Sequence, residues 1–177
     1  MILGIDELLR LVREKELVKH LSEREIQRPE GAGFDIRVGE IYEIEGEGFL
    51  GVEKRKTPTP KLVAQYGKDK EYILKPGAYV LVRTIEEVNI PENLVMLTFP
   101  RSTLQRCGIL LLATQTAPGY SGKLVFGMKN LGPCPFRMEL GARIAHVIFL
   151  EVKGKTSLYR GQWKGGRVAT PELERQV

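Results

Sequence analysis

The chain has 177 residues, 42% of them hydrophobic and 28% charged, which is enough for one well-buried domain over residues 1–177. Its two cysteines, Cys107 and Cys134, cannot build a disulfide scaffold or a four-ligand zinc site, so a reduced cytoplasmic protein is expected. No apolar run is long enough to cross a membrane. The formal net charge of +5 suits an anionic ligand such as a nucleotide.

Residues 5–19 are predicted to form a helix within an N-terminal helical segment, residues 1–22. Asp6 is expected to cap this helix, and Leu8 and Val12 lie on one face at helical spacing. After about Ser22 the helical period stops.

The middle of the chain consists of short β-rich runs separated by glycine and proline turns. Seven runs are predicted as strands: residues 34–38, 41–44, 79–83, 94–99, 108–113, 123–128 and 143–152. Many short strands of this kind indicate a mainly β fold, a sandwich, a distorted β-barrel or a jelly roll, with a short N-terminal helix.

Two stretches are predicted to lack regular structure. Residues 53–71 are charged and carry Pro58 and Pro60. Residues 153–177 are basic and rich in glycine, which favours a flexible tail. Ordering of this tail by an anionic ligand and ordinary fraying of a chain end fit its composition equally well.

The sequence signatures of common catalytic sites are absent. There is no H-E-x-x-H, no Cys-x-x-Cys and no GxxxxGK[ST] phosphate loop. The zinc-dependent base deaminases need a Pro-Cys-x-x-Cys segment, whereas Cys134 is followed by Pro135, Phe136 and Arg137. The sequence therefore argues against a zinc hydrolase.

Residues 99–106 carry a group of potential phosphate ligands. Arg101 and Arg106 bracket the hydroxyls of Ser102 and Thr103 just after a predicted strand. Guanidinium groups and hydroxyls are good phosphate donors. The same residues also fit a turn at a strand end with arginines on the surface.

Residues 117–122 form a second notable segment. Pro118-Gly119 suits a tight turn, and Gly122 allows a close approach of backbone. Tyr120 has the shape to stack on a sugar or a base. An ordinary hairpin with a tyrosine at the edge of the core is the alternative.

Five segments taken in order resemble one superfamily, the trimeric dUTP nucleotidohydrolases (dUTPases) and the zinc-independent dCTP deaminases. The segments are residues 31–38, residues 100–106, residues 117–122 with Asn130 downstream, residues 141–146 and residues 159–167. The N-terminal Met1-Ile-Leu and the helix after it are most similar to the deaminases and the archaeal dUTPases.

The resemblance implies a barrel or jelly-roll subunit, a homotrimer with active sites shared between subunits, and magnesium carried on the substrate triphosphate. It also implies substrate-binding roles for ten residues. Arg101, Ser102 and Thr103 would contact phosphates, and Arg106 beside them is the deaminase-like residue of that segment. Gln115 would lie near the pyrimidine, Tyr120 would pack on the deoxyribose, and Arg160, Gln162, Lys164 and Arg167 would close over the phosphates.

Three positions depart from the pattern of the superfamily. Ala117 stands where the dUTPases have an aspartate, Gly127 where the deaminases have a glutamate, and His146 where glutamine is usual. Without the aspartate and the glutamate, the candidates for activating water are Asp35, Glu139, Glu151 and His146. Asp35 comes first because it lies inside a matching segment, and His146 has a suitable pKa as a free side chain.

The predicted function is a dUTP diphosphatase that converts dUTP to dUMP and pyrophosphate. A dCTP deaminase, possibly bifunctional, is one alternative, and a deoxynucleotide-binding regulator without turnover is another, because of Ala117 and Gly127. A polynucleotide-binding barrel is disfavoured, since basic residues are not interleaved with an aromatic stripe.

Overall fold

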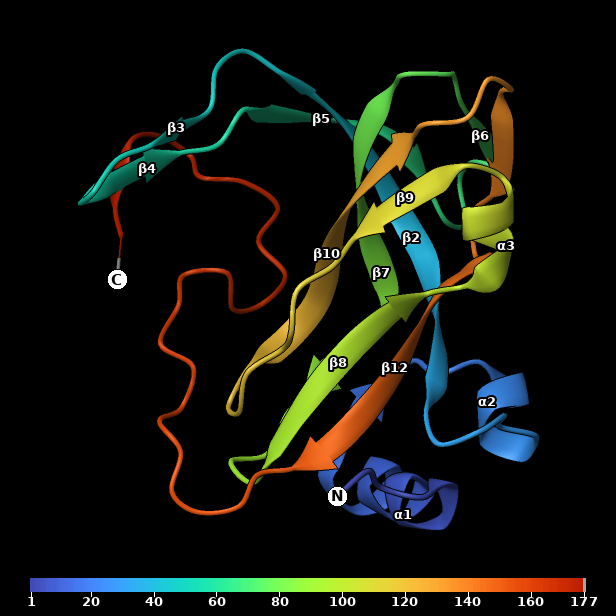
Figure 1. Ribbon diagram of the computed structural model, residues 1–177, viewed down its shortest axis with the longest axis vertical. Helices are drawn as coiled ribbons and strands as arrows, with labels where there is room; N and C mark the ends of the chain where they lie inside the picture. The colour runs from blue at the N-terminus through green and yellow to red at the C-terminus, as the bar shows by residue number, and fades with distance from the viewer. Residues whose placement is uncertain (177) are drawn as a thin grey trace.

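The computed structural model describes residues 1–176, and its main feature is a curled antiparallel sheet with three short helices at its margins (Figure 1). The helices are α1 (Ile5–Lys15), α2 (Glu23–Gln27) and α3 (Ser102–Arg106). The main sheet contains β1 (Val18–Lys19), β2 (Phe34–Glu45), β5 (Thr59–Gln65), β7 (Tyr79–Asn89), β8 (Leu94–Pro100), β9 (Ile109–Leu112), β10 (Ser121–Asn130) and β12 (Arg143–Glu151). Two smaller sheets pair β6 (Glu71–Leu74) with β11 (Phe136–Glu139), and β4 (Lys54–Lys56) with both β3 (Phe49–Leu50) and β13 (Glu174–Arg175).

The main sheet is nearly closed on itself. Its strands follow the order β8-β12-β2-β7-β10-β9, and β1 and β5 add to β7 and β2. Beyond β9 the chain returns to β8, where Thr116 and Met96 exchange two backbone hydrogen bonds of 2.8 and 3.0 Å. These bonds join the two ends of the sheet, which confirms the prediction of a mainly β, barrel-like fold.

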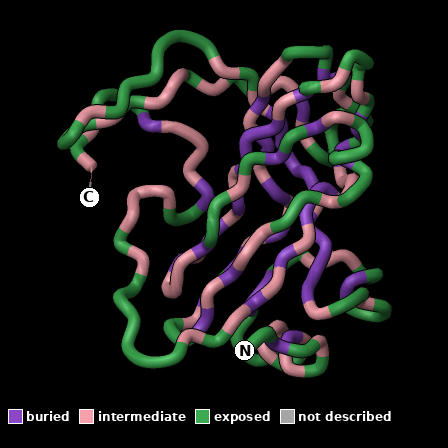
Figure 2. The backbone as a smooth tube through the Cα atoms, viewed as in Figure 1, coloured by how far each residue is buried: buried purple, intermediate pink, exposed green. Residues whose placement is uncertain are grey.

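The core lies inside this curled sheet, as the buried strand positions in Figure 2 show. Along β7 the inward side chains, such as Val80 and Val82, are buried, while the alternate residues Tyr79 and Leu81 face outward and are partly exposed. This alternation follows from the two-residue period of a strand. The outward residues Tyr79 and Leu81 of β7 face a cavity.

The prediction for the N-terminal helix was wrong at its end and at its cap. The helix ends at Lys15, Glu16 adopts a left-handed conformation with φ of 51°, and Gly4 takes the N-cap position in place of Asp6. Val18 then pairs with Val88 of β7, so residues 1–22 are not helical throughout. Val18 is buried in the core when it pairs with β7, and this burial is more favourable than one further turn of helix.

Residues 53–71 are not the loop that their charge suggests. They contain β4 and β5, and β5 pairs with β2. Pro60 is tolerated because β5 pairs with a strand on one side only, so that the missing N–H need not weaken a central strand.

The C-terminal tail, residues 153–176, leaves β12 and runs along one side of the molecule to reach β4 (Figure 1). Its residues are mostly exposed or half-buried (Figure 2), and its regular structure among the described residues is limited to β13. Among residues 1–176, no helix has the length and apolar character needed to span a bilayer.

Candidate functional site

A dense group of charged side chains, here named the Asp35 cluster, consists of Asp35, Arg101, Arg143 and His146. The Asp35 carboxylate is only 3% exposed and forms ion pairs with the guanidinium groups of Arg101 and, at 2.8 Å, of Arg143. His146 Nδ1 lies 3.0 Å from the other carboxylate oxygen. The cluster combines one carboxylate with two fixed cations and an imidazole.

Sheet topology explains why these residues meet although they are far apart in the sequence. β12 lies between β2 and β8, and His146 is the direct cross-strand partner of Asp35 on one side and of Phe99 on the other. Arg101 follows β8 directly, and its N–H donates to the carbonyl of Ile144 on β12. Three of the segments that carry the resemblance therefore join at one place.

The protonation states in the cluster follow from burial and charge. Burial lowers the pKa of His146 below its usual 6.5, and nearby Arg101 acts in the same direction, so the imidazole is neutral at pH 7. Because a carboxylate only accepts hydrogen bonds, Nδ1 carries the proton and Nε2 is left as an acceptor. Burial and neighbouring Arg143 lower the pKa of Arg101, which still remains charged.

Glu25 on α2 is hydrogen-bonded to the backbone of Asp35 and so belongs to the surroundings of the cluster. Its side chain is 1% exposed, accepts a 2.9 Å hydrogen bond from the N–H of Asp35 and pairs with Arg24 at 2.5 Å. Arg24 also lies 3.9 Å from the Asp35 carboxylate. Asp35 therefore has three guanidinium groups within 4 Å of its carboxylate, those of Arg24, Arg101 and Arg143.

A second region is a cavity of about 580 Å³, here named the hairpin cavity, on the outward face of β7 and β10. That volume lies in the range of ordinary small-molecule sites. Its walls come from the outward strand residues, from the turn between β9 and β10, and from the tail. The lining residues that matter here are Tyr79, Leu81, Gln115, Ala117, Tyr120, Val125, Tyr159, Trp163 and Arg167.

The turn before β10 has the tight geometry expected from its sequence. Gly119 has a φ of 80°, and Tyr120 behind it is 8% exposed. The Tyr120 hydroxyl donates to the carbonyl of Lys123 at 2.6 Å, and burial raises its pKa to about 12. Its ring packs edge-on against Tyr159 of the tail, with 5.3 Å between ring centroids.

Two glycines let the tail lie directly on β10. Gly165 donates its N–H to the carbonyl of Ser121 at 2.7 Å, and a Cβ on Gly122 would lie 2.5 Å from the backbone of Gly165. Real Cβ atoms do not approach backbone so closely, so the contact requires glycine at position 122. The close approach expected at Gly122 is therefore confirmed.

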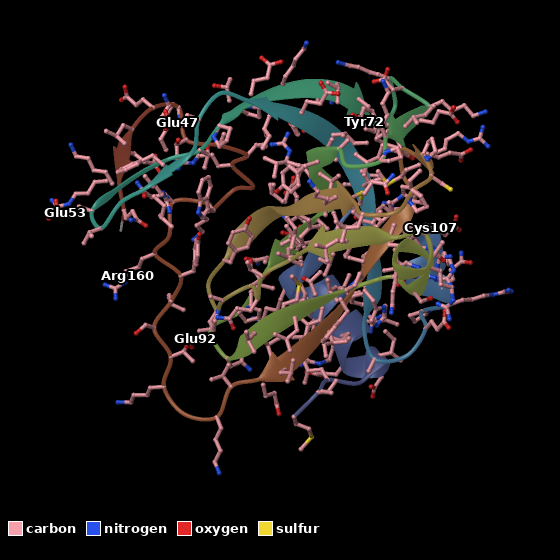
Figure 3. All side chains as sticks on the ribbon, turned by 45° about the horizontal axis from the view of Figure 1, so that its top comes forward. Glu47, Glu53, Tyr72, Glu92, Cys107 and Arg160 are labelled. Carbon is pink, nitrogen blue, oxygen red and sulfur yellow. The ribbon has the colours of Figure 1, made fainter. Side chains whose placement is uncertain are left out.

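The predicted tail residues divide into bound and free side chains. Arg167 pairs with Glu174 at 2.5 Å and lies over Trp163, whose other neighbour is Arg55 of β4, 4.5 Å from the ring centroid. Gln162 accepts a hydrogen bond from Arg55. Arg160 and Lys164 are exposed, and Figure 3 shows Arg160 pointing away from the molecule.

Within the chain most of the predicted site residues fall into two separate groups. Gln115, Tyr120 and Arg167 line the hairpin cavity, whereas Asp35, Arg101 and His146 belong to the Asp35 cluster. Ser102 and Thr103 are exposed on the first turn of α3, directly after Arg101.

Arg106 joins neither group. It lines a separate pocket beside Cys107 and Cys134, both of which are free thiols. Figure 3 shows Cys107 at the end of α3.

Three functional candidates escaped the sequence analysis. Arg143 lies within residues 141–146, one of the five segments, and only its ion pair with Asp35 distinguishes it from other surface arginines. Glu25 carries no local signal at all, because its role depends on Asp35 ten residues later. Tyr79 could have been found from the alternation along β7, which places it on the outward face together with Leu81.

The side chains present favour phosphate over a protein-bound metal. Among residues 1–176 no three His, Cys, Asp or Glu side chains come together as metal ligands. Arginines and hydroxyls, in contrast, are abundant around Arg101. Such donors suit phosphate oxygens, and Mg²⁺ bound to a triphosphate needs few protein ligands.

Comparison with known proteins places most of the chain in the superfamily that the five segments resemble. A family model described as dCTP deaminase-like matches residues 2–152. A deoxyuridine 5'-triphosphate nucleotidohydrolase of Methanocaldococcus jannaschii is 35% identical over 85% of this chain and 94% of its own. A probable deoxyuridine 5'-triphosphate nucleotidohydrolase of Aeropyrum pernix is 40% identical over 76% of this chain and 83% of its own.

Among solved structures, 2'-deoxycytidine 5'-triphosphate deaminase from Agrobacterium tumefaciens shares the fold, with a TM-score of 0.64 and 17% identity. The match covers 84% of this chain but 47% of the Agrobacterium chain. The fold and the order of the five segments agree with these matches. Because the family model matches residues 2–152, the chain belongs to the dCTP deaminase-like family, which also has relatives named as dUTPases.

Proposed function

We propose that the protein is a dUTP diphosphatase that hydrolyses dUTP to dUMP and pyrophosphate. The observation that carries this proposal is the absence of a side chain at Gly127, on the outward face of β10. A deaminase of this family has its glutamate at this position. Gly127 has no side chain, and the ring of Tyr79 covers it. The hairpin cavity is also lined without any aspartate or glutamate among residues 1–176, so it has no acid or base to deaminate a pyrimidine. The two archaeal relatives named as dUTPases support the same choice.

In this proposal the two groups of residues bind different parts of one nucleotide. The base and the deoxyribose occupy the hairpin cavity, with Tyr120 against the sugar and Gln115 near the base. The triphosphate, carrying Mg²⁺, binds Arg101, Ser102 and Thr103. Arg160, Gln162, Lys164 and Arg167 of the tail close over it, which requires Arg167 to exchange Glu174 for phosphate.

The two groups would meet between subunits of a homotrimer. Phe99, next to the Asp35 cluster, is 47% exposed, and Leu112 on β9 is 49% exposed. Large apolar side chains on exposed strands favour an interface with another subunit. Light scattering of the purified protein measures the oligomeric state, and a monomer would contradict this part of the proposal.

His146 is the proposed water-activating base, and Asp35 is its positioning residue. A water oxygen attacks the α-phosphorus, the bond from that phosphorus to the bridging oxygen breaks, and pyrophosphate leaves. The proton of the water passes to Nε2 of His146. Asp35 holds the opposite ring nitrogen, so that the acceptor nitrogen stays free.

The test is a pair of assays on the same protein. With dUTP and magnesium we expect release of pyrophosphate, and with dCTP we expect no ammonia. Ammonia from dCTP would support the deaminase alternative.

A regulator without turnover is the second candidate, favoured by Ala117, which lines the cavity where dUTPases carry an aspartate. Tight binding of dUTP in calorimetry, without pyrophosphate at any temperature below unfolding, would select it.

A complementation experiment tests whether the site is shared. His146→Gln and Arg167→Gln subunits, each inactive alone, are refolded together. If each active site draws on two subunits, mixed trimers contain some intact sites and recover part of the activity. No recovery would indicate that each site lies within one subunit.

A further inference from the structure

Tyr79 takes up the space that a side chain at position 127 would need. Both residues lie on the outward face of the sheet, Tyr79 on β7 and Gly127 on the neighbouring strand β10. A Cβ built on Gly127 would lie 3.0 Å from Tyr79 Cζ and closer still to the hydroxyl oxygen. The backbone at Gly127 has no positive φ, so contact with Tyr79, and not backbone strain, disfavours a larger residue there.

The hydroxyl of Tyr79 differs from those of the other partly buried tyrosines. Tyr42 and Tyr72 donate to glutamates, Tyr120 donates to a backbone carbonyl, and Tyr159 accepts from the N–H of Trp163. The hydroxyl of Tyr79 forms no hydrogen bond with any residue from 1 to 176, and the Tyr79 side chain lines the hairpin cavity. A polar group that faces a largely apolar cavity without a partner is available to a ligand.

The charge state of this phenol is suited to hydrogen bonding. Burial raises the pKa of Tyr79 above its usual 10, so the hydroxyl is protonated throughout the physiological range. The other outward residues near it, Leu81 and Val125, are apolar and offer no competing side-chain partner. The hydroxyl is therefore a single neutral donor in an apolar setting, where a hydrogen bond also gives specificity.

We propose that Tyr79 is a specificity-determining residue whose hydroxyl donates a hydrogen bond to the 4-carbonyl oxygen of the uracil base. The inference rests on the proposed function, because it assumes that the pyrimidine lies in the hairpin cavity. Tyr79 and Gly127 act as a pair. The glycine removes the carboxylate that a deaminase would need, and the tyrosine supplies a base-reading group in the same space.

The test compares Tyr79→Phe with the wild-type protein in calorimetric binding of α,β-imido-dUTP, a non-hydrolysable analogue. Loss of one neutral hydrogen bond is expected to weaken binding about 3- to 10-fold. In the hydrolysis assay KM for dUTP rises by a similar factor, while kcat stays within about twofold, since the base is remote from the reacting phosphorus. Tyr72→Phe is the matched control, because its hydroxyl bonds to Glu43 outside the cavity.

A second nucleotide shows whether the lost interaction is the one proposed. The imido-triphosphate of 2'-deoxyribosyl-pyrimidin-2-one lacks the 4-carbonyl oxygen. The wild-type protein should bind it about 3- to 10-fold more weakly than the uracil analogue. The second analogue also lacks the hydrogen on N3, so the measurement that counts is the change in preference. Tyr79→Phe should prefer the uracil analogue less strongly than the wild type does. A Tyr79→Phe protein that still discriminates between the two as the wild type does would overturn the inference.

The outcomes separate this inference from the proposed function. If dUTP is hydrolysed and Tyr79→Phe binds as tightly as the wild type, the role of Tyr79 is wrong and the diphosphatase stands. If the imido analogue binds and responds to Tyr79→Phe but dUTP is not hydrolysed, the base-reading role stands and the activity fails. If no deoxynucleotide binds, both are wrong.

Discussion

The Asp35 cluster lies between strands that pair along most of their length, whereas the hairpin cavity is covered by a tail with almost no regular structure. Cross-strand register holds Asp35 against His146, and Glu25 supports the same place from α2. The tail is held over the cavity by a glycine contact at Gly122 and by the side chains around Trp163.

The difference indicates a division of labour. A group that transfers a proton, as we propose for His146, must be placed accurately, and backbone pairing on both sides of β12 gives that accuracy. A cavity that admits a nucleotide, as we propose for the hairpin cavity, must open, and a tail held by few contacts opens at low cost in free energy. The variants below test this difference, starting with the largest effect.

His146→Gln should give the largest effect, because it removes the proposed base but introduces the residue usual in the superfamily. We expect kcat to fall about 10²- to 10⁴-fold, with binding of α,β-imido-dUTP nearly unchanged. A His146→Gln protein as active as the wild type would show that the histidine has only a structural role.

The pH profile of the wild-type protein checks the same point. The pKa of folded His146 is lowered by burial, so the proposed base is neutral at pH 7 and able to accept a proton. Activity should decline as the pH falls below 6.5 through the pKa of the folded protein, and His146→Gln should lack this decline.

Asp35→Asn should lower the stability of the whole subunit. The variant keeps the shape of the side chain but leaves Arg101 and Arg143 without their shared anion. Breaking such a pair costs about 3 kcal/mol of unfolding free energy, at the lower end of the usual range because these arginines are 29% and 33% exposed. Urea denaturation measures the loss, and Asp6→Asn serves as the control, because Asp6 is exposed on α1. A loss equal to that of the control would indicate that the cluster contributes little to stability.

Gly127→Ala should be destabilising through contact with Tyr79. We expect a loss of about 1–3 kcal/mol from overpacking. The loss should be smaller when Gly127→Ala is made together with Tyr79→Phe, because the closest atom is then absent. Thermal unfolding of the two single variants and the double variant gives this coupling, and strictly additive losses would argue against the contact.

Arg55→Gln should have the smallest effect on stability, about 1 kcal/mol or less. The reason is that Arg55 contacts the C-terminal tail and does not contribute to the packing of the main sheet. The substitution removes the ion pair with Glu174 and the contact with Trp163. The sensitive measurement is trypsin cleavage at the exposed Lys164, which should become faster. Arg10→Gln, which breaks an exposed ion pair on α1, is the control and should leave the rate of cleavage unchanged. Equal rates in both variants would mean that Arg55 does not hold the tail.

Patterns local in the sequence were sufficient for much of the fold. The alternation of apolar residues around Val80 and Val82 and the turn at Gly119 depend on near neighbours only. The end of the first helix was misplaced because Val18 is buried by pairing with Val88, seventy residues away. Residues 59–65 were missed as a strand for a similar reason, since their partner strand β2 stabilises them.

The sequence by itself determined the strand-rich class, the tight turns and the order of the motifs, because side-chain periodicity and glycine geometry act over a few residues. The tertiary structure alone decided that Asp35 meets His146, that Glu25 accepts a hydrogen bond from the N–H of Asp35, and that Tyr79 covers Gly127. These contacts depend on which strands become neighbours in the sheet. That choice is made by burial of the whole core, and no local stretch of residues specifies it.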